Sequence, residues 1–167
     1  MSMHSGNEIF CEEVYLSEII EGLQNGDVLP MGTSKYVLLE FAPWVTGEEI
    51  ISCVCRVRKE TEYEPIIAHI ERYRWIHDDE YLLKGIKEMR IPVQVNAYSL
   101  VEESSSDVRN FARKLLANKL VTFLGSDAHK IDHRPVNLTS GVAYVIETCD
   151  EEYARDVCYR NAKTLLV

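Results

Sequence analysis

Short apolar runs that alternate with helix-like segments most constrain the fold of this 167-residue chain. Each of four such runs is long enough for one buried strand, and they span residues 37–41, 65–69, 92–96 and 121–125. Between and around them, apolar residues recur at helical spacing in segments 13–26, 47–60, 80–90 and 107–120, and one or two further helices are predicted from about residue 139. Strands alternating with helices imply βαβ units and a parallel sheet. The chain is therefore predicted to be one α/β domain, built either as part of a barrel or as a small open sheet.

Side chains that bind metals lie in or just after three of these runs. Asp127 and His129 follow the last run, His69 ends the second, and Glu40 is a charged residue inside an apolar run. Taken alone, His129 could be a loop residue and Glu40 could form a strand-end salt bridge. Functional groups collect at the carboxyl ends of parallel strands, however, and a buried charge is costly unless it is paired or ligated. Together these residues predict a site for a divalent cation, which carboxylate and imidazole suit.

Two arginines lie shortly after these residues. Arg72 is three residues beyond His69, and Arg134 is five residues beyond His129. Each alone could be a surface arginine paired with an acid. The guanidinium group, however, matches the oxygens of a phosphate, so the combination with a metal predicts a phosphoester substrate. The cation would activate water while the arginines bind the phosphate.

Composition excludes several classes of function. The net charge is −9, with no basic block, which argues against general binding to nucleic acids or membrane surfaces. No transmembrane span or signal peptide is recognisable, so a cytoplasmic protein is expected. The five cysteines are odd in number and lack zinc-ligand spacing, which predicts free thiols. Cys149 and Arg155 have the spacing of thiol-based phosphatases, but the intervening acids would repel phosphate.

Several short motifs of the sequence resemble those of a known protein family. Its motifs appear in order as Gly6-Asn7-Glu8-Ile9, Tyr36 to Phe41, Pro65 to Tyr73, Val95 to Ser99, and Ser126 to His129 with Arg134-Pro135. The chain resembles the manganese-dependent protein-tyrosine phosphatases of bacterial capsule and exopolysaccharide operons. These enzymes belong to the polymerase-and-histidinol-phosphatase superfamily. The resemblance runs from Gly6 to the C-terminus.

The resemblance implies a distorted TIM-like barrel of seven βα units with three metals at the strand ends. Mn²⁺ is the implied cation, with Zn²⁺, Fe²⁺ or Mg²⁺ as alternatives. The implied substrate is a phosphotyrosine-bearing protein, the tyrosine kinase that controls polysaccharide export. Carried over by position, the implied metal ligands are Glu8, Glu40, His69, Asp127 and His129, and the implied catalytic, phosphate-binding residues are Arg72 and Arg134.

The His-x-His and Asp-Asp-Gly motifs that begin such domains do not occur in this sequence. Residues 1–167 are therefore expected to match the C-terminal two-thirds of the domain, as a partial barrel. The second metal would keep all its protein ligands, and activity of the chain alone would be impaired. Open strand edges would favour a homo-oligomer. Two alternatives stay open: a non-catalytic binding module with one metal site, and a phosphatase for a small ester such as histidinol phosphate.

Overall fold

The computed structural model describes residues 4–101, 104–130 and 135–166. Its strands are β1 (Glu8–Phe10), β2 (Tyr36–Glu40), β3 (Glu64–Ile67), β4 (Gln94–Asn96) and β5 (Phe123–Gly125). Its α-helices are α1 (Leu16–Asn25), α2 (Gly47–Glu60), α3 (Glu80–Met89), α4 (Ser106–Ala117), α5 (Thr139–Thr148), α6 (Glu151–Arg155) and α7 (Asn161–Lys163). Short 3₁₀ turns are η1 (Glu13–Tyr15), η2 (Ile70–Arg72), η3 (Arg74–Ile76), η4 (Ala97–Leu100) and η6 (Thr164–Leu166), and η5 (Asp156–Arg160) is a π-helix.

All strand pairs are parallel, which confirms the predicted α/β class. One sheet has the order β1-β2-β3, and a second contains β4 and β5. Each predicted run overlaps an observed strand, whereas β1 was not expected as a strand. The described residues contain no closed sheet, so the expected TIM-like barrel is not confirmed. None of the helices in this described part has the length and apolar character needed to cross a bilayer.

The described residues form two compact units. The first contains the chain up to Ala68, the segment Tyr73–Pro92 and the residues from Lys163 onward. The second contains His69–Arg72 and Val93–Ala162. Each unit therefore carries its own parallel sheet, β1 to β3 in the first and β4 with β5 in the second.

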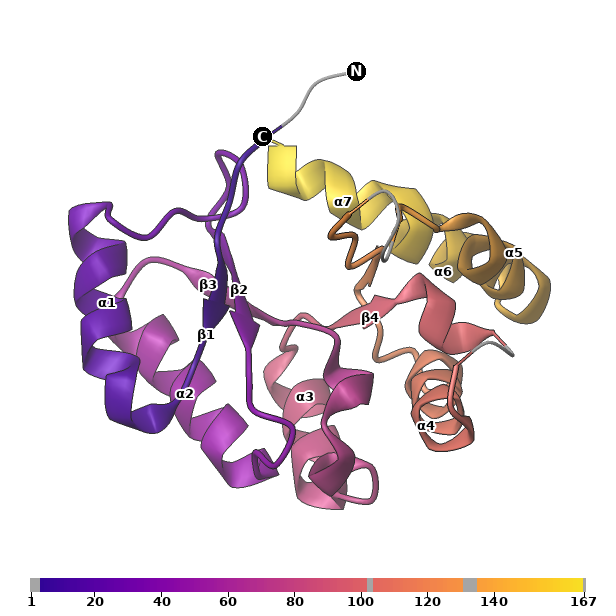
Figure 1. Ribbon diagram of the computed structural model, residues 1–167, viewed down its shortest axis with the longest axis horizontal. Coiled ribbons are helices and arrows are strands. Elements are labelled where there is room, and N and C mark those ends of the chain that lie inside the picture. The colour runs from indigo at the N-terminus through magenta and orange to yellow at the C-terminus, as the bar shows by residue number, and fades with distance from the viewer. Residues whose placement is uncertain (1–3, 102–103, 131–134, 167) are drawn as a thin grey trace. The chain divides into compact units, whose positions relative to one another are not determined.

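The first unit buries one face of its sheet under helices. Ile9, Val37 and Leu39 are buried, while their neighbours along β1 and β2 are more exposed. Side chains alternate between the faces of a strand, so this pattern assigns one face to the core. Figure 1 shows α1 and α2 together on one side of these strands. Glu8, Phe10 and Glu40 consequently share the other face.

Helix α2 begins with a reciprocal cap. The Glu49 amide donates to the Thr46 hydroxyl at 3.3 Å, and the Thr46 amide donates to the Glu49 carboxylate at 2.8 Å. Each bond satisfies an amide that the helix itself leaves unpaired. The bonds that the Glu49 carboxylate accepts from the Thr46 amide and hydroxyl lower the pKa of Glu49. The cap explains why α2 starts where the sequence pattern predicted it.

The second unit has a strand that is buried throughout. All three residues of β4 are buried, including the polar Gln94 and Asn96. Helix α5 approaches the backbone of η4 very closely, because a Cβ at Gly141 would lie 2.4 Å from the carbonyl oxygen of Ala97. Only glycine allows such an approach, so Gly141 sets how α5 packs in this unit.

Tyr73 joins two segments of the first unit. Its hydroxyl accepts a hydrogen bond from the Phe41 amide at 3.0 Å and donates to the Ala68 carbonyl at 2.8 Å. The side chain is fully buried, and its ring packs edge-on against Phe41. A single hydroxyl therefore ties the residue after β2 to the residue after β3.

Replacing Tyr73 by Phe should destabilise the protein by about 1–3 kcal/mol, because the buried Phe41 amide loses its acceptor. Urea unfolding of wild type and variant measures this difference. The matched control is Tyr81→Phe, at a position 62% exposed, which should change stability by less than about 0.5 kcal/mol. Equal stability of both variants would contradict a structural role for the Tyr73 hydroxyl.

Candidate metal and phosphate site

Glu8, Glu40 and His69 form a cluster that could hold a metal ion. Each offers one ligand atom, and these atoms all lie within 4.8 Å of one another. Glu8 is exposed, Glu40 half-buried and His69 buried. Within the described residues this is the one group of three or more such side chains at that spacing. The sequence predicted these three residues as ligands, and the structure brings them together.

The strands explain how the cluster forms. Phe10 of β1 pairs with Glu40 of β2, so Glu8, two residues earlier, lies on the same face as Glu40. His69 follows the end of β3 by two residues. The intervening Ala68 donates its amide to the Leu39 carbonyl at 2.9 Å, which continues the ladder between β2 and β3. His69 is thereby attached directly beside the strand that carries Glu40.

Two predicted site residues have unusual backbone angles. His69 has φ of 26° and Asp127 has φ of 49°, in the left-handed region that side chains disfavour. The other described non-glycine residues with positive φ, Arg90 and Lys119, come directly at or shortly after the ends of α3 and α4, where such angles are common. His69 and Asp127 have no such helix-end explanation, so tertiary contacts must hold them.

A buried amide side chain holds the backbone of His69. The backbone N–H of His69 donates to Gln94 Oε1 at 2.6 Å, and Gln94 Nε2 donates to Asn96 Oδ1 at 2.9 Å. Glycine at position 125 leaves room for this arrangement, because a Cβ there would lie 2.3 Å from Gln94 Nε2. Gln94 and Asn96 point to the same face of β4 and were not predicted as site residues.

Arg72 and Asp127 form an ion pair in the second unit. Arg72 Nη1 lies 3.0 Å from Asp127 Oδ2, and the same oxygen accepts a hydrogen bond from Asn96 Nδ2 at 3.2 Å. The Asp127 side chain is 6% exposed, whereas that of Arg72 is 34% exposed. The buried carboxylate therefore orients a guanidinium group that solvent can still reach.

The other predicted site residues lie outside the cluster or outside the described part of the chain. His129 is exposed, and its Nδ1 lies 3.0 Å from the carbonyl oxygen of Asp127 and 3.5 Å from Asp127 Oδ1. Neither Asp127 nor His129 belongs to the cluster of Glu8, Glu40 and His69. Arg134 lies outside the described residues. The ligand roles of Asp127 and His129 and the phosphate role of Arg134 stay predictions.

Glu71 is a buried acid that the sequence reasoning did not single out. It is completely buried, and its Oε1 accepts hydrogen bonds from the Asn96 amide at 3.1 Å and the Ser99 hydroxyl at 2.7 Å. Burial raises the pKa of Glu71, and these two bonds partly oppose the rise. Glu71 thus ties η2, which carries Arg72, to the end of β4. The alternation of polar Gln94 and Asn96 in an apolar run was the available signal for this network.

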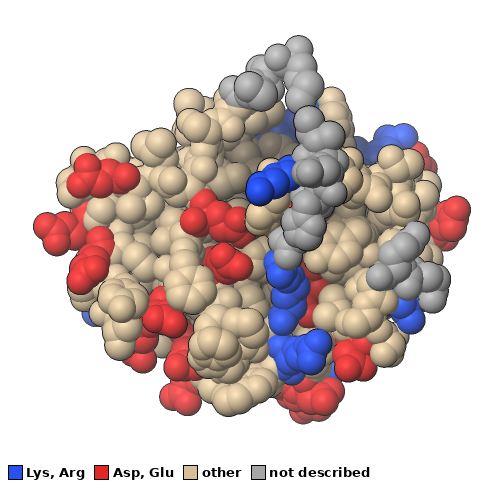
Figure 2. Space-filling view, viewed as in Figure 1, with Lys and Arg blue, Asp and Glu red and all other residues tan. Residues whose placement is uncertain are grey.

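Acidic side chains are not confined to the candidate site. Figure 2 shows acidic side chains spread over the visible face, with basic ones among them. This distribution agrees with the net charge of −9 being largely solvated. The clustered carboxylates Glu8 and Glu40 stand out because they converge with a buried histidine.

The donor set of the cluster fits a divalent transition metal. Two carboxylates and one imidazole are ligands used by Mn²⁺, Fe²⁺ and Zn²⁺, while Mg²⁺ prefers oxygen donors alone. Three protein ligands also leave coordination positions for water and substrate. The chemistry of these side chains therefore agrees with a catalytic type of metal site.

Comparison with known proteins identifies the family. The family described as capsular polysaccharide synthesis, CpsB/CapC, matches residues 1–167. The chain belongs to this family.

Named relatives within the family agree with this assignment. The chain is 26% identical over 166 residues to the tyrosine-protein phosphatase CpsB of Streptococcus agalactiae, covering 96% of this chain and 66% of that protein. It is 30% identical over 142 residues to the putative tyrosine-protein phosphatase CapC of Staphylococcus aureus, covering 83% and 52%. It is 28% identical over 152 residues to the tyrosine-protein phosphatase YwqE of Bacillus subtilis, covering 89% and 58%.

A solved structure shares the fold. It comes from a study of YwqE from Bacillus subtilis and CpsB from Streptococcus pneumoniae, described there as unique metal-dependent tyrosine phosphatases. The TM-score is 0.77 at 24% identity, over 89% of this chain and 58% of that chain. This CpsB/CapC family member therefore spans between about half and two-thirds of the length of these relatives.

The buried Glu71 gives the first prediction for the site. Glu71→Gln retains an acceptor for Asn96 and Ser99, whereas Glu71→Ala removes it, so the Ala variant should be less stable by about 1–3 kcal/mol. Urea unfolding in the presence of a chelator measures this difference. If Glu71→Gln and Glu71→Ala lower the free energy of unfolding equally, the acceptor at Oε1 does not hold η2 to β4.

Comparing wild type with Glu71→Gln also tests how the ionisation of Glu71 changes stability with pH. Because the folded-state pKa of Glu71 is raised, its stabilising contribution is complete below the ordinary value of 4.5 and is lost as pH rises through the raised value. Wild type should therefore lose stability relative to Glu71→Gln as pH increases above 4.5. The exposed Glu21→Gln control should show no such trend. A difference that stays constant with pH would contradict this linkage.

Proposed function

We propose that this protein is a metal-dependent phosphatase that removes phosphate from tyrosine residues of a protein and acts in capsular polysaccharide synthesis. The observation that carries the proposal is the convergence of Glu8, Glu40 and His69, with the partly exposed Arg72 three residues after His69. Membership of the CpsB/CapC family and the names of its relatives support this activity over other uses of such a cluster.

The side chains divide into two tasks under this proposal. Glu8, Glu40 and His69 hold the cation, which supplies the Lewis acidity needed to activate water and polarise a phosphoryl oxygen. Arg72 binds a phosphate oxygen through its planar donors. Asp127 orients Arg72, and Asn96 in turn donates to Asp127. Glu71 and Gln94 are positioning residues, because they act on the backbone and on neighbouring side chains.

Several finer points belong to the same proposal. Mn²⁺ is the proposed cation, and a bacterial tyrosine kinase is the proposed substrate, which places the reaction in the cytoplasm. Asp127 and His129 are proposed to contribute further metal ligands and Arg134 a second phosphate contact. A TIM-like barrel, of which residues 1–167 would be the C-terminal two-thirds, and a homo-oligomer are also proposed. The parallel pairing of all described strands supports the barrel.

A second candidate function is a binding module that keeps one metal site without hydrolysis. The observation that favours it is that the described residues hold one cluster of three ligands, whereas clustered phosphoesterases use additional metals to stabilise attacking and leaving oxygens. Such a module would bind the cation and phosphate with little turnover. Metal binding and hydrolysis therefore need to be measured separately.

Glu40→Gln should abolish or strongly weaken binding of Mn²⁺, because an amide replaces one of the two carboxylates in the cluster. Isothermal titration of the metal-free protein with Mn²⁺ measures this, with circular dichroism to verify folding. The control is Glu21→Gln, an exposed carboxylate on α1, which should bind Mn²⁺ as wild type does. Unchanged affinity of a folded Glu40→Gln variant would remove the metal site from the proposal.

Arg72→Lys should lower Mn²⁺-dependent hydrolysis of a phosphotyrosine peptide by roughly 10²–10³-fold, because the planar fork is replaced by a point charge. Binding of Mn²⁺ itself should change little, since Arg72 is not in the cluster. Steady-state kinetics and metal titration on the same preparation distinguish these effects. Wild-type protein that binds Mn²⁺ and phosphate without measurable turnover would support the binding module instead.

A further inference from the structure

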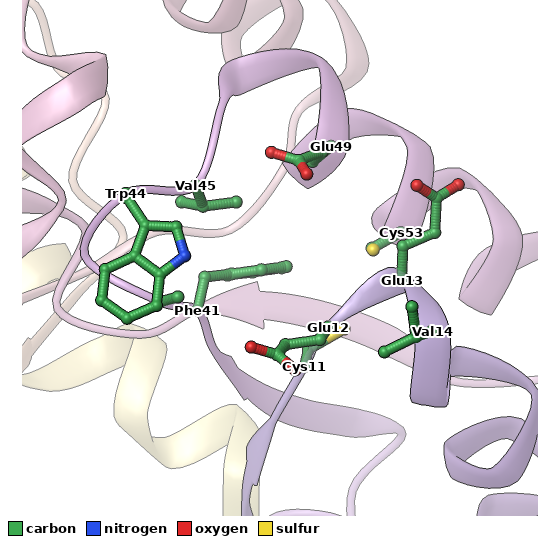
Figure 3. A pocket seen from close by; sticks show the side chains of 10 residues that line it. Cys11, Glu12, Glu13, Val14, Phe41, Trp44, Val45, Glu49 and Cys53 are labelled. Carbon is green, nitrogen blue, oxygen red and sulfur yellow. The ribbon is translucent and has the colours of Figure 1, made fainter.

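A pocket where β1 and β2 end contains two of the cysteines. Its volume is about 250 Å³, and Cys11, Phe41, Trp44 and Cys53 are among its lining residues. Figure 3 shows both sulfurs on the pocket lining, one from the chain just after β1 and one from α2. This pocket takes no part in the metal and phosphate site described above.

The two thiols come from separate elements and meet inside the first unit. Cys11 directly follows β1, while Cys53 lies in α2. These two residues are 2% and 1% exposed, and a side-chain hydrogen bond joins them. Cys55, two residues further along α2, is exposed, because successive positions on a helix turn by about 100°. Only one thiol of α2 therefore faces Cys11.

We propose that Cys11 and Cys53 are a modification site, at which a small uncharged hydroperoxide forms a reversible disulfide between them. Neither the metal site nor the proposed phosphatase activity is needed for this inference. It rests on two free thiols from different elements that share one pocket.

The reaction balances with the hydroperoxide as the oxidant. The thiolate of Cys53 attacks one peroxide oxygen, the O–O bond breaks, and a sulfenic acid forms as water or alcohol leaves. The Cys11 sulfur then attacks the Cys53 sulfur, forming the S–S bond and releasing water. Two thiols lose two electrons and two protons, which reduce the peroxide. Another thiol reverses the process by exchange.

The hydrogen bond between the thiols supports this order of attack. It lowers the pKa of Cys53 and raises the pKa of Cys11, with burial adding to the rise for Cys11. Nearby Arg56 also favours the Cys53 thiolate. The thiolate is the nucleophile in thiol oxidation, so Cys53 is suited to attack and Cys11 to resolve.

Charge around the pocket selects the kind of oxidant. Glu12, Glu13 and Glu49 line it together with the thiols (Figure 3). These carboxylates oppose thiolate formation and repel anionic oxidants such as oxidised glutathione. The lining residues Val14 and Trp44 are 78% and 61% exposed, so a molecule close to water in size can enter from solvent. An uncharged peroxide meets both conditions.

The disulfide would restrain the strand that carries Glu8. Cys11 donates its amide to the Glu40 carbonyl at 2.7 Å, so it already belongs to the ladder between β1 and β2. A bond to Cys53 would join this strand covalently to α2. Crosslinks between positions distant in sequence stabilise mainly by restricting the unfolded chain.

The experiment treats the folded protein with hydrogen peroxide and maps its thiols by mass spectrometry without reduction. A Cys149→Ser/Cys158→Ser variant is used beside wild type, since those two cysteines line another common pocket. We expect a linked pair of peptides containing Cys11 and Cys53, the loss of two hydrogen atoms, and full reversal by dithiothreitol. Oxidation should raise Tm by on the order of 10 °C.

Matched variants and a second oxidant complete the test. Cys55→Ser should form the same link, whereas Cys53→Ser should not form it and should show no rise in Tm. Oxidised glutathione at equal concentration should react much more slowly than peroxide. The proposal is overturned if Cys55 is oxidised while Cys11 and Cys53 stay reduced, or if the link appears only after unfolding. Mapping of wild type gives the same decision should the serine variants fail to fold.

Discussion

The parallel register between β1 and β2 is the constraint on which the candidate metal site depends. Phe10 pairs with Glu40, and the two-residue period of the strands then places Glu8 on the face of Glu40. A slip by one residue would turn one carboxylate toward the helices. The buried residues Ile9, Val37 and Leu39 oppose such a slip, because it would bring them into solvent. Core packing on one face therefore fixes the positions of the candidate metal ligands Glu8 and Glu40 on the other.

The second unit uses buried hydrogen bonds in place of apolar packing to position its functional groups. Gln94, Asn96 and Glu71 are buried, and each makes bonds that hold the His69 backbone, η2 or the Asp127 carboxylate. Buried polar groups are costly when unpaired, so these contacts specify a single arrangement. The left-handed backbone angles of His69 and Asp127 persist within that network. Arg72 gains a fixed direction while part of its side chain stays accessible to solvent.

Strand β1 connects two kinds of chemistry through its alternating faces. Glu8 belongs to the candidate metal cluster, and Cys11, which follows β1 and continues its ladder with β2, contributes to the thiol pocket. An odd separation along a strand places side chains on opposite faces, so the two sites need not compete for space. The proposed disulfide would act on the strand itself, and any effect on the cluster would pass through the backbone bond between Cys11 and Glu40.

Local patterns in the sequence determined the α/β class, four of the strands and the main helices, including α2 over its observed span of Gly47–Glu60. Periodicity and short apolar runs suffice for these elements. Glu40 and His69 could be named from their positions in apolar runs, whereas Glu8 was named from its match to a family motif. The three-residue strand β1 was too short to show a period. The Glu71–Asn96–Gln94 network and the meeting of Cys11 with Cys53 depend on partners distant in sequence. Which side chains face one another across such distances is set by strand register and helix packing, so only the tertiary structure decided them.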